Sequence, residues 1–189
     1  MAPELTTADF SWSGYFWTAA TVLESWRGFQ SRGGAYASQN DDSPSDGQVR
    51  VIFAPEGRDD SPLRDDELAM VNWALKHQEE VRDAFLQALL AEYPSIRAEC
   101  LDADIEDEYV PEVAEAEGFR DLLGLGTLTV HQLEHEGLPY VGLLLGCEWD
   151  AEHGLGALLH GTRVVAIGGA DTAIYLWMAE QDAEKSDGR

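Results

Sequence analysis

The sequence predicts a single α+β domain, residues 1–189, in which an antiparallel β-sheet is covered by one long helix. Three observations predict this fold. Residues 62–93 have the periodicity of an amphipathic helix. Short alternating or apolar runs before and after that stretch are typical of strands. No repeat or linker divides the 189 residues, a length usual for one domain. The expected order of elements is βββ-α-ββββ-α.

The first 60 residues predict variable N-terminal strands. Residues 9–26 mix aromatic and β-branched side chains, which indicates two strands with turns near Gly14 and Ala19. Residues 31–47 are rich in Gly, Ser and Asp and predict a loop. Residues 48–54 alternate apolar and polar side chains, so a third strand is expected there.

The long helix is expected to run from about Pro62 to Tyr93. Ser61 can cap its first amides, Pro62 suits the first helical position, and three carboxylates at 65–67 lie near the positive end of the helix dipole. We expect Pro94 to end the helix. Its apolar face is formed by Leu68, Met70, Val71, Ala74, Leu75, Val81, Phe85 and Ala88.

Residues 101–118 predict an acidic, solvated loop, because a dense block of like charge repels itself and stays in water. Tyr109, Val110 and Phe119 are expected to hold this loop on the domain. Its carboxylates are Asp102, Asp104, Glu106, Asp107, Glu108, Glu112, Glu115 and Glu117.

The region from 127 to 168 predicts a C-terminal β-meander. Four short apolar runs, 128–133, 140–147, 155–159 and 163–167, alternate with turn-forming segments. His160 and Gly161 suit a tight turn between the last two strands. Asp171 is expected to cap a short helix that ends near Trp177, and an irregular tail is expected after it.

Composition limits the partners of the chain. The 12 basic and 36 acidic residues give a net charge of −24, which repels nucleic acid and anionic lipid and attracts basic proteins. The longest apolar run, 138–147, is about half the ~20 residues that a membrane span needs. No secretory signal is recognisable, and two isolated cysteines lack metal or redox spacing. We therefore expect a cytoplasmic protein that binds neither nucleic acid nor membrane.

His131, Glu134 and His135 match the H-x-x-E-H pattern of inverted zinc peptidases. That chemistry needs both histidines on one face of a helix, with the glutamate beside the metal-bound water. Residues 127–130 read as a strand instead. We therefore expect neither a zinc ion nor another cofactor at this motif.

The stretch 147–156 is the most distinctive in the chain. Asp150, Glu152 and His153, with Cys147, could assemble a metal site or an acid–base pair. The same residues also suit a turn between strands, in which Asp150 accepts bonds from loop amides, Trp149 packs and His153 bonds a carboxylate or carbonyl. The turn is the favoured interpretation.

Residues 139–173, with the W-D-x-E-H-G-x-G core at 149–156, resemble a bacterial family of unknown function. The preceding helix is similar too, so the resemblance covers about two-thirds of the chain. The resemblance implies an immunity or accessory protein of the kind that some genomes encode at polymorphic toxin loci. It transfers no catalytic or binding residue to this chain.

Three function classes follow. The leading one is a non-enzymatic binding protein, such as an immunity protein that occludes a basic toxin. The second is a small metal-dependent or hydrolytic enzyme that uses the loop 149–153. The third is an acidic housekeeping domain whose charge reflects the proteome of its host. No catalytic or metal-ligating residue is assigned. The candidate binding residues are Trp149, Asp150, Glu152, His153, Asp104, Glu106, Asp107 and Glu108.

Overall fold

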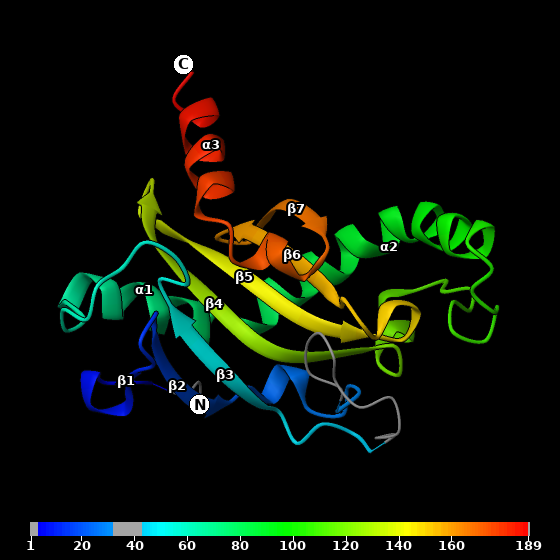
Figure 1. Ribbon diagram of the computed structural model, residues 1–189, viewed down its shortest axis with the longest axis horizontal. Helices are drawn as coiled ribbons and strands as arrows, with labels where there is room; N and C mark the ends of the chain where they lie inside the picture. The colour runs from blue at the N-terminus through cyan, green and yellow to red at the C-terminus, as the bar shows by residue number, and fades with distance from the viewer. Residues whose placement is uncertain (1–3, 32–42, 189) are drawn as a thin grey trace.

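The computed structural model describes residues 4–31 and 43–188, and within them the chain forms one seven-stranded sheet with three α-helices (Figure 1). The strands are β1 (Ser11–Trp12), β2 (Trp17–Val22), β3 (Gln48–Phe53), β4 (Leu123–His135), β5 (Leu138–Cys147), β6 (Leu155–His160) and β7 (Arg163–Gly168). The helices are α1 (Asp65–Lys76), α2 (Gln78–Asp102) and α3 (Leu176–Ser186). The predicted order of elements is therefore found, except that two helices stand where one was expected.

The strands lie in the sheet in the order in which they occur in the chain. Every neighbouring pair is antiparallel except β3 and β4, which are parallel. The prediction of a wholly antiparallel sheet is wrong at this pair. Strands joined by tight turns must run antiparallel. A helical crossover can instead carry the chain back to the end of the sheet at which the preceding strand began, so that the next strand runs parallel to it, and α1 and α2 form such a crossover between β3 and β4.

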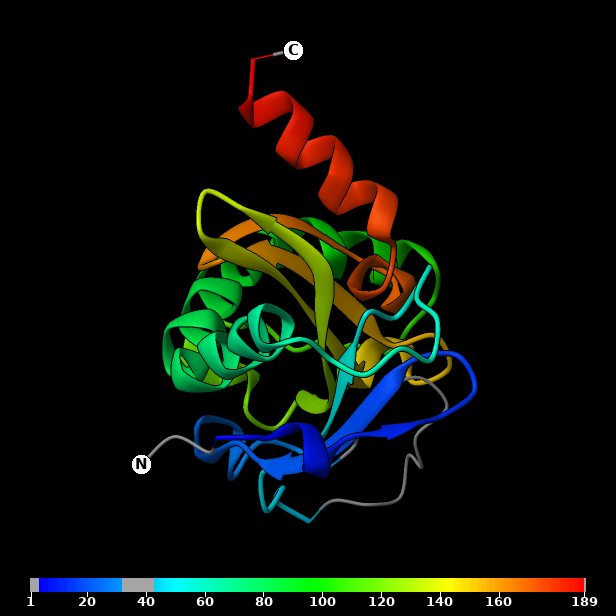
Figure 2. The same ribbon diagram turned by 90° about the vertical axis from the view of Figure 1, so that its left-hand side faces the viewer.

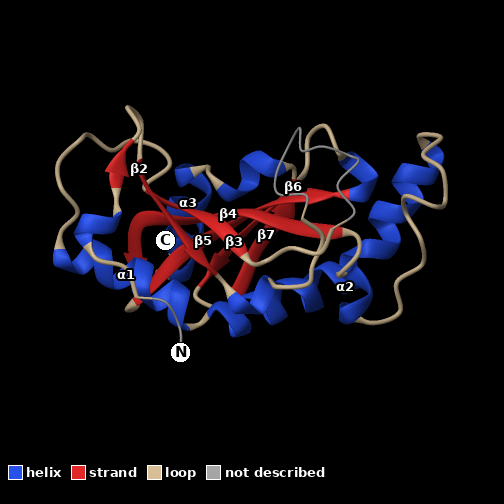
Figure 3. Cartoon of the chain, turned by 90° about the horizontal axis from the view of Figure 1, so that it is seen from below, coloured by secondary structure: helices blue, strands red, loops and turns tan. Residues whose placement is uncertain are grey.

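One face of the sheet is covered by α1 and α2, as Figure 3 shows. The main core lies between these helices and the sheet, and it includes Val51 and Phe53 of β3 and Phe85 and Leu89 of α2, all fully buried. Burying each such side chain contributes about 1.5–3 kcal/mol. This apolar face is the one that the periodicity of the sequence predicts.

The opposite face of the sheet, here called the outer face, is covered over β5 and β6 by a 3₁₀ turn, Ala170–Ala173. Two glycines allow the close approach. A Cβ atom on Gly142 would lie 2.1 Å from the carbonyl oxygen of Ala173, and one on Gly156 would lie 2.4 Å from that of Gly169. Only glycine fits at these two strand positions.

Helix α3 follows that turn and projects beyond the sheet (Figure 2). The backbone amide of Leu176 donates to the Glu56 carboxylate (2.8 Å), at the positive end of the helix dipole. Asp182 accepts bonds from Tyr140 (2.7 Å) and Arg163 (2.6 Å). The helix therefore begins after the predicted position, and the irregular tail predicted after Trp177 is instead helical, because Asp182 holds it to β5 and β7.

The predicted long helix is divided at His77, whose φ and ψ of −101° and 25° are not helical. The next residue, Gln78, is buried: its side-chain oxygen accepts bonds from the amide and hydroxyl of Ser25, and its nitrogen donates to Leu75 (3.1 Å). These contacts fix where α2 starts. The first helix begins at Asp65 rather than Pro62, and the carboxylate of Glu67 accepts the amide of Arg64 (2.8 Å) in place of the predicted Ser61 cap.

Helix α2 continues through Pro94 to Asp102, so the prediction that Pro94 ends the helix is wrong. Proline removes one backbone bond, but the side chains around it compensate by packing. Tyr93 is buried with its ring 5.1 Å from Phe119, and Ile96 packs on the core one turn later. The helix therefore extends nine residues further than expected, from Tyr93 to Asp102.

Other boundaries also differ from the predictions. The turn at Gly14 (φ 101°) is confirmed, whereas Ala19 lies inside β2, paired with Val51. The predicted loop 31–47 is irregular from 43 to 47, and residues 32–42 lie outside the described residues. The turn at Gly161 (φ 56°) is confirmed. The predicted meander starts earlier, at Leu123, and its register is interrupted by bulges.

No helix in the described ranges is long and apolar enough to cross a membrane.

Candidate functional site

The loop after β5 has the geometry of the predicted turn. A carboxylate oxygen of Asp150 accepts bonds from the amide (3.0 Å) and the ring Nδ1 (2.9 Å) of His153. The amide of Gly154, at φ 71°, donates to the carbonyl of Asp150 (2.8 Å). Trp149 is buried against the ring of Tyr93 (5.3 Å). Asp150 and His153 therefore close this loop, as the favoured interpretation of the sequence predicts.

The four candidate residues of this loop are divided between two surroundings. Trp149 and Asp150 line a hollow, described below, between the loop and α2. Glu152 is exposed, and the side chain of His153 is 67% exposed. Neither lines the hollow. The structure therefore does not gather the loop residues into one site.

The hollow, here called the acidic hollow, has a volume of about 520 Å³. It is formed by the C-terminal half of α2, the residues after it, the loop after β5 and the end of β7. Among the described residues, three carboxylates line it and no basic residue does. Its lining is Glu92, Ile96, Glu99, Cys100, Ala103, Ile105, Trp149, Asp150, Gly154, Leu155, Ile167, Gly168 and Gly169.

The carboxylates near the acidic hollow affect the pKa of Cys100. Partial burial, followed by the nearby charges of Asp150 and Glu99, raises the pKa of its thiol. Negative surroundings disfavour the thiolate, which is the nucleophilic form of cysteine. The hollow therefore keeps Cys100 protonated at neutral pH and suits a cation better than a reaction that begins with a thiolate.

The predicted acidic segment 101–118 begins at the end of α2 and borders the hollow through Ile105. Val110 and Phe119 are fully buried and hold the segment on the domain, as predicted, but Tyr109 is 45% exposed and does not. The candidate residues Asp104, Glu106 and Glu108 are exposed.

Asp107 has a different position from the other three candidates of the segment. Its carboxylate forms an ion pair with Arg97 of α2, whose Nε also donates to the carbonyl of Val110 (2.8 Å). The hydroxyl of Tyr93 donates to the carbonyl of Pro111 (3.0 Å) close by. The side chain of Asp107 is itself 72% exposed, but its charge is paired with Arg97, whereas Asp104, Glu106 and Glu108 form no ion pair with a described residue.

The H-x-x-E-H residues lie on β4, where the sequence predicts a strand. His131 is fully buried, and its Nε2 donates to the carbonyl of Ala173 (3.2 Å). Burial lowers its pKa to about 4, so this ring is neutral at physiological pH. Within residues 4–31 and 43–188, no group of three or more His, Cys, Asp or Glu is placed to hold a metal ion.

A family comparison places the site in context. The sequence profile of a domain of unknown function, DUF6985, matches residues 37–175. The chain belongs to the DUF6985 family. All residues that line the acidic hollow lie within the matched part of the DUF6985 chain, whereas β1, β2 and α3 lie outside it. Comparisons with curated proteins and with solved structures gave no match.

Sequence reasoning missed the part of this DUF6985 hollow that α2 contributes. Glu92 lies just before Pro94, and Glu99 and Cys100 lie beyond it, where no helix was expected. One signal was available: Ile96 and Cys100 are four residues apart, three and seven after Tyr93, and extend the apolar stripe of the helix past the proline.

Proposed function

We propose that this protein is a non-enzymatic binding protein whose acidic hollow receives a basic side chain of a partner protein. The observation that supports the proposal most directly is the lining of the hollow. Glu92, Glu99 and Asp150 line it from two segments distant in sequence, and no basic residue in the described part of the chain lines it with them.

The shape and chemistry of the hollow fit a lysine or arginine. Its apolar lining includes Ile96, Trp149 and Leu155, which suits the methylene stem of such a side chain. The carboxylates suit the charged head, and a hydrogen bond to a charged group contributes about 1.5–3 kcal/mol. An anchor of this kind, surrounded by polar residues, is typical of the dominant contacts in protein interfaces.

The exposed carboxylates of the acidic segment add a second contribution, which acts before contact. Asp104, Glu106 and Glu108 extend the negative surface away from the hollow. Together with a net charge of −24, they attract a basic protein over distance and raise its association rate. The acidic hollow would bind the basic side chain of the partner, and the acidic segment would attract the partner electrostatically before contact.

The partner that fits this surface best is a basic toxin, such as a nuclease with a cationic active site. A row of carboxylates can take the place of nucleic-acid phosphates and occlude such a site. The proposed role is that of an immunity protein acting in the cytoplasm, where the free thiols Cys100 and Cys147 would stay reduced.

The experiment uses a short arginine-rich peptide, amidated at its C-terminus, as the probe. Binding is measured by isothermal titration calorimetry and mapped by amide chemical shifts. We expect the Glu92→Gln, Glu99→Gln double variant to bind about tenfold more weakly than the native protein, because it loses two contact charges.

The matched control is the double variant Glu180→Gln, Glu184→Gln. Both residues are exposed on α3, so this variant loses the same net charge outside the hollow. We expect its affinity to fall about twofold or less. Equal weakening by the two double variants would mean that only net charge matters and would contradict the assignment of the hollow. No saturable binding would favour the housekeeping interpretation.

A further inference from the structure

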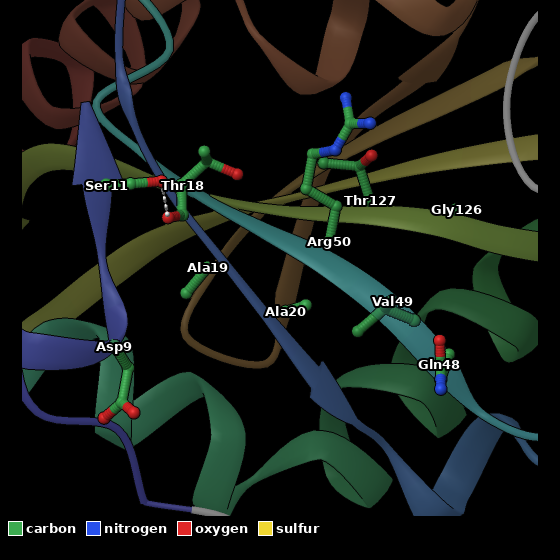
Figure 4. Close-up of a pocket in the computed structure, with 10 residues that line it drawn as sticks. All are labelled: Asp9, Ser11, Thr18, Ala19, Ala20, Gln48, Val49, Arg50, Gly126 and Thr127. Atoms are coloured by element: carbon green, nitrogen blue, oxygen red, sulfur yellow. Dashed lines mark hydrogen bonds between the residues drawn. The ribbon is translucent and has the colours of Figure 1, made fainter. Parts of the chain in front are cut away.

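A second hollow, with a positive charge, lies on the outer face of the sheet over β2, β3 and β4 (Figure 4). Its volume is about 570 Å³, and no described residue lines both this hollow and the acidic hollow. We call it the arginine hollow, because Arg50 of β3 is the basic residue that lines it among those the structure describes. The residues that the argument uses are Asp9, Ser11, Thr18, Ala20, Arg50 and Thr127.

Arg50 differs from every other arginine in the described ranges. The others each form an ion pair with a carboxylate, which is the expected outcome in a chain with three acidic residues for each basic one. Arg50 is exposed, and it forms no ion pair or hydrogen bond with a described residue. The paired arginines are Arg27, Arg58, Arg64, Arg82, Arg97, Arg120 and Arg163.

The neighbours of Arg50 leave its guanidinium group open. In the sheet it lies between Ala20 of β2 and Thr127 of β4, one small and one short side chain. Asp9, the carboxylate that lines the same hollow, accepts bonds from the amide and hydroxyl of Thr6 (2.7 Å each) and points away from Arg50 in Figure 4. Within residues 4–31 and 43–188, the Arg50 cation therefore has no counterion in this hollow.

A β-bulge places a hydroxyl group beside this cation. Leu125 pairs with Leu145 and Thr127 pairs with Leu144, so Gly126 is an extra residue in β4. In a regular strand Leu125 and Thr127 would share the core face. The bulge turns Thr127 to the outer face, where it stands on the same side of the sheet as Arg50 (Figure 4).

The hydroxyls of Thr127 and Thr18 form no hydrogen bond with a described residue, and that of Ser11 makes only a long one to the carbonyl of Thr18 (3.5 Å). The arginine hollow thus offers the two-pronged donor of a guanidinium group and further hydroxyl donors. This combination matches the two oxygens of an oxyanion.

The net charge decides which oxyanion fits. A field from a net charge of −24 repels a dianion twice as strongly as a monoanion. We propose that the arginine hollow binds a singly charged carboxylate, held by two parallel bonds from Arg50 and one from Thr127. The carboxylate can belong to a small organic acid or to the C-terminus of a peptide, and the site is independent of the function proposed for the acidic hollow.

The test titrates the ¹⁵N-labelled protein with butanoate and with N-acetyl-alanyl-alanine at constant ionic strength, following the Arg50 Nε–H signal by NMR. For so open a site we expect saturation with a dissociation constant on the order of 1 mM. The uncharged counterparts, butanamide and N-acetyl-alanyl-alaninamide, should bind at least tenfold more weakly. Tighter binding of the peptide would identify a chain terminus as the source, and equal binding would identify a free acid.

Three variants complete the test, and thermal unfolding verifies that each is folded. Arg50→Gln should weaken butanoate binding at least tenfold, and Thr127→Val about threefold. Arg27→Gln, which makes the same charge change at an exposed ion pair with Glu24, should alter it less than twofold. The proposal is overturned if Arg50→Gln binds as well as the native protein, if the amides bind as well as the acids, or if inorganic phosphate binds more tightly than butanoate.

Discussion

Glu67 is the most deeply buried carboxylate among the described residues, and its removal should destabilise the start of α1. Its side chain is 1% exposed and accepts two bonds from Arg58 (2.6 and 2.9 Å). Arg64 contributes its backbone amide and its guanidinium group (2.8 Å each). The side chain of Arg58 is only 11% exposed, so it depends on Glu67 for its counterion.

Replacing Glu67 with alanine leaves the buried Arg58 charge without this counterion, although its guanidinium group still donates to the carbonyls of Ser61 and Pro62. Breaking a buried ion pair in this way costs about 3–5 kcal/mol. In a chain of 189 residues each kcal/mol corresponds to about 2–4 °C in the melting temperature, so Glu67→Ala should lower it by about 6–20 °C. Urea unfolding at pH 7, followed by far-ultraviolet circular dichroism, measures the free energy of unfolding directly.

Two further variants separate burial from charge. Asp66→Ala removes a neighbouring carboxylate that is 65% exposed, and it should cost less than about 1 kcal/mol. The double variant Arg58→Met, Glu67→Met replaces the buried pair with apolar side chains and should recover much of the loss. The reasoning is refuted if Glu67→Ala costs under about 1 kcal/mol, or no more than Asp66→Ala.

Three other predictions follow from the structure. Gly142→Ala should destabilise the fold by about 1–3 kcal/mol or more because its Cβ meets the Ala173 carbonyl, whereas Gly169→Ala, with nothing within 4 Å, should be nearly neutral; urea unfolding compares them. Burial lowers the pKa of His131 to about 4 from 6.5, so only the unfolded chain gains a proton between these values. The free energy of unfolding should therefore keep its full value above pH 6.5 and fall by ~3 kcal/mol as the pH is lowered towards 4. The variant His131→Gln should not show this decrease, and equal pH profiles for the variant and the native protein would contradict the prediction. Reversing the charge of three of the exposed carboxylates of the acidic segment should leave the free energy of unfolding within ~0.5 kcal/mol but slow association with a basic partner at low salt, as stopped-flow mixing would show; an unchanged rate would contradict steering. Those three residues are Asp104, Glu106 and Glu108.

Local patterns in the sequence determined the elements whose causes are local. Alternation in residues 48–54 predicted β3, and glycines at positions 14 and 161 predicted turns that require a positive φ. The loop at Asp150 was also predictable, because its bonds to His153 and Gly154 span only three and four residues. In each case the side chain that decides the structure and the backbone that it acts on are neighbours in the chain.

The tertiary structure decided what depends on distant partners. The break at His77 follows from a contact between Gln78 and Ser25, 53 residues apart, and α2 passes Pro94 because Tyr93 packs on Phe119. The parallel pairing of β3 with β4 depends on how the helices cross the sheet, which periodicity does not record.

Both hollows are formed by residues that only the tertiary structure brings together. The sequence by itself determined that the protein is strongly acidic, and it identified Trp149 and Asp150 as candidate binding residues. It could not show that Glu99 and Asp150 line the same hollow, or that Arg50 forms no ion pair with a described carboxylate while every other described arginine has one. A charge is recorded at one position in a sequence, but its partner is set by packing between segments that only the folded chain brings together.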